Sequence, residues 1–119
     1  EDGCLRYVLG CMGGDGQMQT QLQLLLDLCD GGLDPQQSVS RPRWYLERRQ
    51  TTSLLVEDGA ADIQAMERLG YDVMVVNRFE EVMGHAQVIE IRPDGILVGA
   101  ADPRSDGQVA TPHLSPAGR

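Results

Sequence analysis

Four glycines fall within the seven residues GCMGGDG, residues 10–16, directly before a segment rich in glutamine and leucine. Consecutive backbone amides at the start of a helix can bind phosphate, hold a developing oxyanion, or form a tight turn. Phosphate is disfavoured, because the stretch fits neither GxxxxGK[ST] nor GxGxxG and Asp15 adds a negative charge. Two interpretations stay open: a site for a small anion, and a turn that lets the helix pack closely on a sheet.

Side chains that could act as nucleophile, acid or base are sparse and do not cluster. His85 opens a predicted strand and His113 lies in a polar tail, without the serine or cysteine motif of a catalytic triad. Cys4, Cys11 and Cys29 lack the spacing of a zinc site, and we expect them to be buried, unreactive thiols. The residues therefore predict no metal site and no cofactor.

The charge of the chain excludes several functions. All ten basic residues are arginines, and with 18 acidic residues they give a net charge of −8. Without lysine there is no Schiff-base chemistry, and the negative field repels nucleic acid and anionic membranes, so neither is an expected partner. Arg41, Arg43, Arg48 and Arg49 form a basic cluster that could hold a carboxylate, but ion pairs within the chain are the favoured interpretation.

The apolar pattern predicts one domain of mixed α/β (α+β) class. The expected elements are a strand at 5–9, a helix at 16–30, a short helix from Asp34 to before Pro42, a strand at 53–58, a helix ending at Gly70, a strand at 73–76, and a hairpin turning at 93–95. The long helix is expected to be apolar on two sides, with Met18, Leu22, Leu25, Leu26 and Cys29 on its inner face and Leu24 and Leu28 widening it. The later helix is expected to turn Ile63, Met66 and Leu69 inward.

Five segments, taken in order, resemble the C-terminal part of the small subunit of the γ-glutamyltranspeptidase family. They are EDGCLRYVLG, MGGDGQMQTQLQLLLDLCDGGLDPQQSVSRPRW, LLVEDG, LGYDV and MGHAQVIEIRPDGILVGAADPRSDG. The resemblance covers residues 1–107, and residues 108–119 are interpreted as a polar, flexible tail.

This resemblance implies an N-terminal-nucleophile hydrolase, an αββα sandwich formed by self-cleavage of one precursor. In that family a threonine at the new N-terminus of the small subunit attacks a γ-glutamyl carbonyl, and the acyl-enzyme passes to water or an amine. Paired glycines of the family donate backbone amides to the oxyanion, and they align with Gly13 and Gly14 here.

Two departures from the family pattern limit what the resemblance implies. The family's nucleophile precedes the glycine pair, so Thr51 and Thr52, which follow it, do not take that role. Cys11 and Met12 replace the usual Ser-Pro, which suggests a divergent branch with a donor other than glutathione.

We therefore expect a C-terminal fragment that supplies the oxyanion loop, lacks the nucleophile and is inactive alone. Its expected partners are the large subunit and the N-terminal part of the small subunit, with a γ-glutamyl small molecule as substrate of the intact enzyme. A non-catalytic α/β scaffold or assembly module is the alternative. A fragment with an open apolar face could also form a homo-oligomer.

Overall fold

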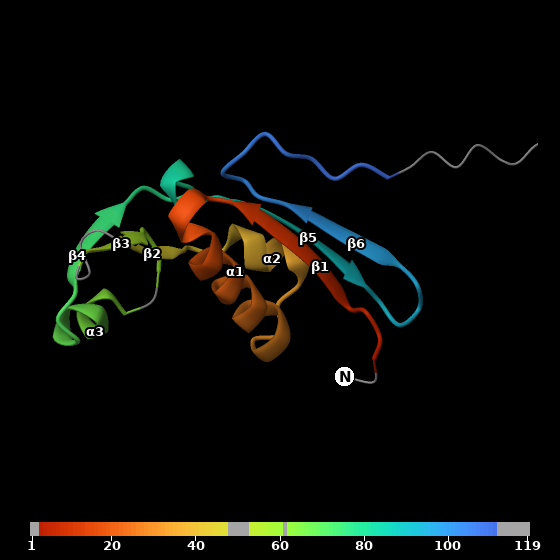
Figure 1. Ribbon diagram of the computed structural model, residues 1–119, viewed down its shortest axis with the longest axis horizontal. Helices are drawn as coiled ribbons and strands as arrows, with labels where there is room; N and C mark the ends of the chain where they lie inside the picture. Colours follow the sequence, from red (N-terminus) through yellow and green to blue (C-terminus); the bar gives the residue numbers. More distant parts are fainter. Residues whose placement is uncertain (1–2, 48–52, 61, 112–119) are drawn as a thin grey trace, which may run out of the picture.

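The computed structural model describes residues 3–47, 53–60 and 62–111 of the chain. Its strands form two sheets of three strands each, joined through a central pair of helices (Figure 1). Sheet A has the order β1-β5-β6, from β1 (Tyr7–Met12), β5 (His85–Ile91) and β6 (Leu97–Ala101), all antiparallel. Sheet B has the order β2-β3-β4, from β2 (Trp44–Leu46), β3 (Ser53–Glu57) and β4 (Asp72–Val76). In sheet B the β3–β4 pair is parallel and is connected through α3 (Ile63–Arg68).

The central helices are α1 (Gln17–Leu25) and α2 (Pro35–Ser40). The long helix continues beyond α1 as a π-helical turn, Leu26–Asp30, so its predicted extent is confirmed. Asp34 caps α2 as expected: its Oδ1 accepts from the amide of Gln37 at 2.8 Å, and the Gln37 side chain accepts from the amide of Asp34 at 3.2 Å. This reciprocal capping box satisfies two amides that the first turn would otherwise leave unpaired.

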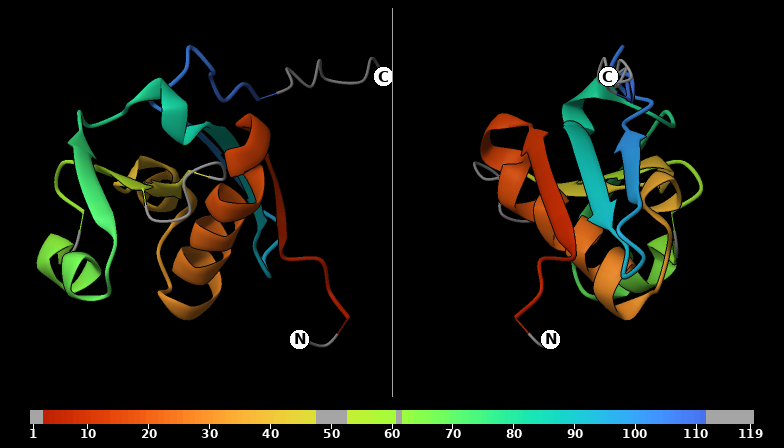
Figure 2. Two further views of the ribbon diagram at one scale, coloured as in Figure 1. Left: turned by 60° about the vertical axis from the view of Figure 1, so that its left-hand side comes forward. Right: turned by 90° about the vertical axis from the view of Figure 1, so that its right-hand side faces the viewer.

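The core lies between sheet A and the two central helices. It consists of Leu24, Leu28, Val39, Ala86, Val88 and Ala100, with Tyr7, Leu9 and Cys11 packed against it. The opposite face of sheet A has no helix over it, as the right-hand view of Figure 2 shows. Val8, Met12, Ile89 and Leu97 are exposed on that face. Among the described residues, helices therefore cover sheet A on one face only (Figure 2), and on the other face the side chain of Val109 lies against Gly99.

The predicted inner face of the long helix is wrong. Met18 is 78% exposed, and Leu22, Leu25, Leu26 and Cys29 are exposed as well. Of the apolar residues predicted for this helix, Leu24 and Leu28 are buried, and the polar Thr20 is buried beside them. Apolar residues occupy a broad arc of this helix, wider than the face that packs on sheet A, so their spacing alone does not select the buried face. The short loop from β1 sets the rotation, and Thr20 fixes it by donating to the carbonyl of Met83 at 3.1 Å.

Two glutamines of α1, Gln19 and Gln23, hydrogen-bond to the edge of β2 that does not pair with β3. Gln19 accepts from the amide of Leu46 at 2.8 Å and donates to its carbonyl at 3.0 Å. One turn later, Gln23 makes the same pair of bonds with Trp44, each at 3.0 Å. Each side-chain amide thus imitates the peptide group of a neighbouring strand, because it offers one donor and one acceptor. The two sheets are joined through α1 in this way.

Most other predicted elements are confirmed. The hairpin turns where expected, with Gly95 at φ +82° and Asp94 Oδ1 accepting from the amide of Ile96 at 3.0 Å. Strands β3 and β4 occupy the predicted positions. The first strand begins at Tyr7 rather than at Leu5, and β2 was not predicted. Leu69, expected to point inward, is 77% exposed.

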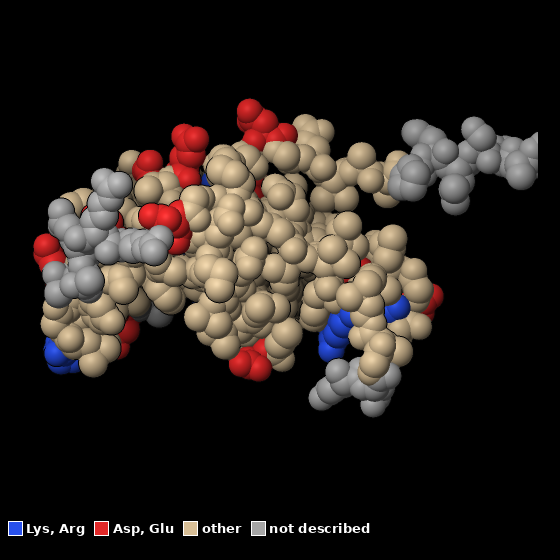
Figure 3. Space-filling view, viewed as in Figure 1, with Lys and Arg blue, Asp and Glu red and all other residues tan. Residues whose placement is uncertain are grey.

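The surface is uncharged over much of the face seen in Figure 3, and its acidic side chains gather toward the periphery. The α1 segment contributes to this neutrality, because it contains no charged residue. Among the described helices, none has the length and apolar character needed to cross a membrane.

Candidate functional site

The glycine loop, residues 13–16, joins the end of β1 to the start of α1. It forms a short 3₁₀ turn in which the amide of Gly16 donates to the carbonyl of Gly13 at 2.8 Å. Gly14 has φ +51°, a left-handed conformation that side chains with a branched Cβ disfavour. Gly13 is extended, but a Cβ added there would lie 3.3 Å from the Cα of Gly84. Gly14 is thus required for its left-handed φ angle, and Gly13 is required for the close approach of Gly84.

The amides of Gly13 and Gly14 are the candidate donors. β1 is an edge strand of sheet A. For neither amide is an acceptor recorded among the residues that the structure describes. Neighbouring backbone N–H groups are the kind of donor that oxyanion sites use, which makes this loop the candidate site.

Cys11 lies just before the loop but is poorly suited to be a nucleophile. Its side chain is half-buried, and its thiol is within 3.4 Å of the carbonyl oxygen of Gln17. Burial raises the pKa of the Cys11 thiol above its ordinary value, so the reactive thiolate is scarce at neutral pH. The expectation that all cysteines are buried is wrong, since Cys4 and Cys29 are exposed at the surface.

Four ionisable residues form a buried ionic cluster behind the loop: Arg43, Glu57, Asp102 and Arg104. Arg43 Nη2 lies 2.6 Å from Asp102 Oδ2, and Arg104 Nη1 lies 3.0 Å from Asp102 Oδ1. Arg104 also binds Glu57, with Nε donating to Oε1 at 2.8 Å and Nη2 pairing with Oε2. The cluster has no net charge, which is what allows four charged groups to leave water together.

The cluster connects the two sheets. Glu57 ends β3 in sheet B and accepts from the amide of Arg43 at 2.9 Å. Asp102 follows β6 in sheet A and accepts from the amide of Ala86 at 2.9 Å. Arg104 further donates to the carbonyls of Val39 at 2.9 Å and Arg41 at 2.8 Å. This part of the site is structural, because its polar atoms are engaged within the chain.

The two buried arginines differ in the direction of their pKa shifts. Burial lowers the pKa of Arg43, and the nearby charge of Arg104 lowers it further, against the opposing effect of Asp102. Burial acts against ionisation of Arg104 too, but its hydrogen bond to Glu57 and the charges of Asp102 and Glu57 outweigh burial and raise its pKa. The prediction of ion pairs within the chain is confirmed for Arg43, and for Arg41, which pairs with Asp27 at 2.5 Å.

Some predicted residues cannot be placed. Arg48, Arg49, Thr51, Thr52 and His113 lie outside the described residues. The roles of Glu57, Asp102 and Arg104 were not expected from the sequence. A carboxylate closing the apolar strand SLLVE, and an Asp-Pro-Arg following another strand, are the signals that could have identified them.

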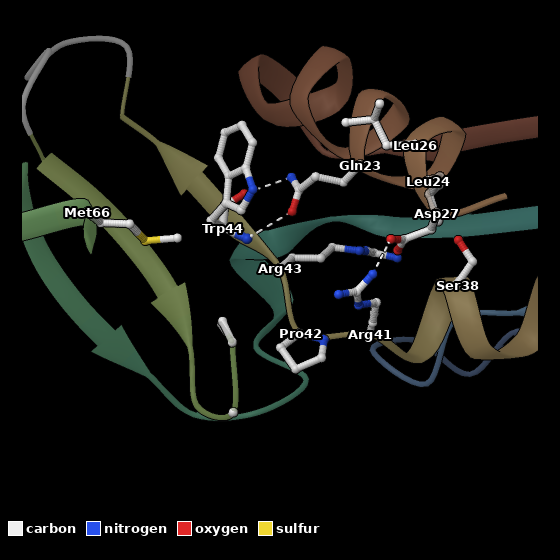
Figure 4. Close-up of a pocket in the computed structure, with 12 residues that line it drawn as sticks. Gln23, Leu24, Leu26, Asp27, Ser38, Arg41, Pro42, Arg43, Trp44 and Met66 are labelled. Atoms are coloured by element: carbon white, nitrogen blue, oxygen red, sulfur yellow. Dashed lines mark hydrogen bonds and ion pairs between the residues drawn. The ribbon is translucent and has the colours of Figure 1, made fainter. Parts of the chain in front are cut away.

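A cavity of about 350 Å³ lies between the central helices and sheet B with its helix α3, away from the glycine loop (Figure 4). In that view, Arg41 and Asp27 pair on one side, and Gln23 binds the backbone of Trp44 on another. Ser38 is buried at its wall, and its hydroxyl has no recorded partner among the described residues. Most polar groups of this cavity are thus engaged with one another, so the glycine loop is the better candidate site. No group of three or more metal-ligating side chains is found in the described part of the chain.

The model of the gamma-glutamyltranspeptidase family matches residues 1–111. The chain belongs to the gamma-glutamyltranspeptidase family. It is 46% identical over 108 residues to the oxamate amidohydrolase proenzyme of Klebsiella pneumoniae, covering 87% of this chain and 20% of that protein. It is 38% identical to the glutathione hydrolase-like YwrD proenzyme of Bacillus subtilis, covering 86% of this chain and 20% of that protein. The chain therefore spans about a fifth of the length of these curated relatives.

Solved structures agree with this membership. A cephalosporin acylase from Bacillus halodurans superposes with a TM-score of 0.77 at 38% identity, covering 86% of this chain and 19% of that chain. A gamma-glutamyltranspeptidase from Pseudomonas nitroreducens superposes with a TM-score of 0.76 at 23% identity, covering 93% of this chain and 57% of that chain, and it supports the fold alone. The predicted family and the N-terminal-nucleophile hydrolase fold class are confirmed.

Proposed function

We propose that this chain is the C-terminal part of a gamma-glutamyltranspeptidase-family enzyme that cleaves an amide through an acyl-enzyme, and that Gly13 and Gly14 donate to the oxyanion. The observation that supports this most strongly is the pair of amides in the glycine loop with no recorded acceptor among the described residues. Attack on an amide carbonyl moves charge onto its oxygen. Donors fixed before the reaction stabilise that charge without reorganisation.

The nucleophile of the complete protein is proposed to be an N-terminal threonine outside this chain. We propose that the rest of the same precursor packs on two apolar surfaces: the helix-free face of sheet A, and the outward face of α1 with Met18, Leu22 and Leu25. Exposed apolar surface of this kind marks an interaction site. The large subunit and the N-terminal part of the small subunit are the proposed occupants.

The proposed substrate is a γ-glutamyl amide. A small amide that carries a neighbouring carboxylate, such as oxamate, is the second candidate, because the relative at 46% identity is named as an oxamate amidohydrolase. Both substrates pass through a tetrahedral oxyanion, so the proposed role of Gly13 and Gly14 is the same for either.

The test compares the complete polypeptide that contains this sequence with the 119-residue chain alone. We expect the complete, self-cleaved protein to release aniline from a γ-glutamyl anilide or ammonia from oxamate, and the chain alone to release neither above the buffer rate. Turnover by the chain alone would contradict the proposal that it lacks the nucleophile. Absence of turnover on both substrates by the self-cleaved protein would favour the scaffold alternative.

A further inference from the structure

The backbone of Gly84 lies close against the start of the glycine loop at Met12 and Gly13. A Cβ added at Gly84 would lie 2.7 Å from the carbonyl oxygen of Met12 and 3.3 Å from the Cα of Gly13. Real side chains do not approach backbone so closely, so any substitution at Gly84 must displace the end of β1. The contact is mutual, since a Cβ added at Gly13 would meet the Cα of Gly84 at 3.3 Å. The backbone position of Gly13 is therefore set by direct contact with Gly84.

Gly84 is itself held from three directions. Arg43 Nη1 donates to the carbonyl of Gly84 at 2.9 Å. Thr20 donates from α1 to the carbonyl of the preceding residue, Met83, at 3.1 Å. The amide of Gly84 donates to the carbonyl of Glu81 at 3.0 Å. Arg43 and Thr20 are both buried, so their two hydrogen bonds hold the Met83–Gly84 peptide against the loop.

The support continues into the buried ionic cluster. The guanidinium of Arg43 pairs with Asp102 at 2.6 Å, and both side chains are buried. Thr20 lies one turn into α1, the helix that directly follows the glycine loop. Its hydrogen bond to Met83 therefore links the C-terminal end of the loop to the residue before Gly84. The loop is thus clamped between α1 on one side and the Met83–Gly84 peptide on the other.

We propose that Gly84 is a positioning residue for the oxyanion donors, and that Thr20 and Arg43 hold it against Gly13. This inference rests on the proposed role of Gly13 and Gly14. Gly84 touches neither substrate nor reacting atoms and acts through the backbone of Gly13. Because a misplacement of about 1 Å can cost on the order of 100-fold in rate, a shift of the Gly13 amide should lower kcat more than it changes KM.

The experiment uses the complete, self-cleaved protein, with rates expressed per active site counted by covalent labelling. Gly84→Ala is expected to lower kcat by about 10- to 100-fold with KM changed less than about threefold. Gly95→Ala is the matched control: it has nearly the same φ, +82° against +78°, but a Cβ there meets no atom within 4 Å. This control is expected to keep kcat within about twofold, since it carries the backbone strain without the contact.

Thr20 provides a second test that does not depend on the folding of Gly84→Ala. Thr20→Val keeps the shape and removes the hydroxyl bonded to Met83, and we expect a several-fold lower kcat; Thr20→Ser keeps the hydroxyl and should restore it. A boronic acid that forms a tetrahedral anion on the nucleophile should bind Gly84→Ala and Thr20→Val more weakly, by about the factor by which kcat/KM falls.

The outcomes separate this inference from the proposed function. Unchanged kcat in Gly84→Ala and Thr20→Val, together with a lower kcat in Gly14→Val, would overturn the positioning role alone. Unchanged kcat in all three would overturn the oxyanion role and the positioning role together. An equal loss of kcat in Gly95→Ala and Gly84→Ala would also overturn the positioning role, because the loss would then follow from backbone strain.

Discussion

Replacing Arg104 by methionine is expected to lower the free energy of unfolding by about 3 to 5 kcal/mol. Arg104 and Glu57 are fully buried, and they bind each other through two pairs of atoms. Methionine keeps much of the volume but leaves Glu57 without its cation and leaves the backbone carbonyl of Arg41 without its donor. Urea denaturation of the 119-residue chain, followed by the fluorescence of its single tryptophan, Trp44, measures the change.

The matched control is Arg68→Met on α3. Arg68 pairs with Asp62 at 3.9 Å, and both side chains are about two-thirds exposed, 67% and 64%. An exposed pair of this kind contributes under about 1 kcal/mol, so this variant should unfold close to the parent. A loss of similar size in both variants would show that the buried ionic cluster contributes no more than a surface pair.

The double variant Glu57→Gln, Arg104→Met tests the mechanism of that loss. Each single change leaves an uncompensated buried charge, whereas the double change removes the charge and its partner together. Its cost is therefore expected to be smaller than the sum of the single costs. Strict additivity would contradict an account in which Glu57 and Arg104 compensate each other.

Replacing Gly14 by valine in the complete protein is expected to lower kcat by on the order of 100-fold. Gly14 has φ +51°, and a β-branched residue strongly disfavours that region, so the loop must rotate and its amide must turn away from the oxyanion. Gly14→Asn should lose less, because asparagine tolerates the left-handed region and a Cβ there meets no described atom within 4 Å. Steady-state kinetics on the better of the two proposed substrates gives kcat for each variant.

Gly32→Val is the control for strain alone. Gly32 has φ +63° at the end of the π-helical turn, and a Cβ there also meets no atom within 4 Å. It is expected to lower thermal stability without a comparable change in kcat. Equal kcat losses in Gly14→Val and Gly32→Val would place the effect in folding and would argue against an oxyanion role for the glycine loop.

The sequence predicted local structure better than packing. Turn and cap residues act over a few positions, so the hairpin at Gly95 and the start of α2 at Asp34 were predictable. The buried face of α1 was not predictable, because its leucines spread over a broad arc of the helix. The choice of face depends on Thr20 reaching Met83, 63 residues away in the chain. Strand β2 was missed for a similar reason: it is three residues long and depends on the side chains of Gln19 and Gln23 at its edge.

The candidate site was predictable in part. The spacing of Gly13 and Gly14 indicated a backbone anion site or a turn, and the family resemblance favoured the former. Gly84 could not be found from spacing, because its contact with Gly13 arises from the pairing of β1 with β5. The buried ionic cluster was not predictable either, because its residues are spread along the chain from Arg43 to Arg104. A charged side chain is also normally expected at the surface.

The most direct measurement is a crystal structure of the complete, self-cleaved protein with a boronic acid bound covalently to its nucleophile. The quantity to read is the distance from the amide nitrogens of Gly13 and Gly14 to the anionic oxygen of the adduct. We predict that both distances are about 2.7 to 3.1 Å, the range of an oxyanion hole. An adduct whose oxygen is held by other donors, with both glycine amides beyond hydrogen-bonding distance, would contradict the proposed role of this chain.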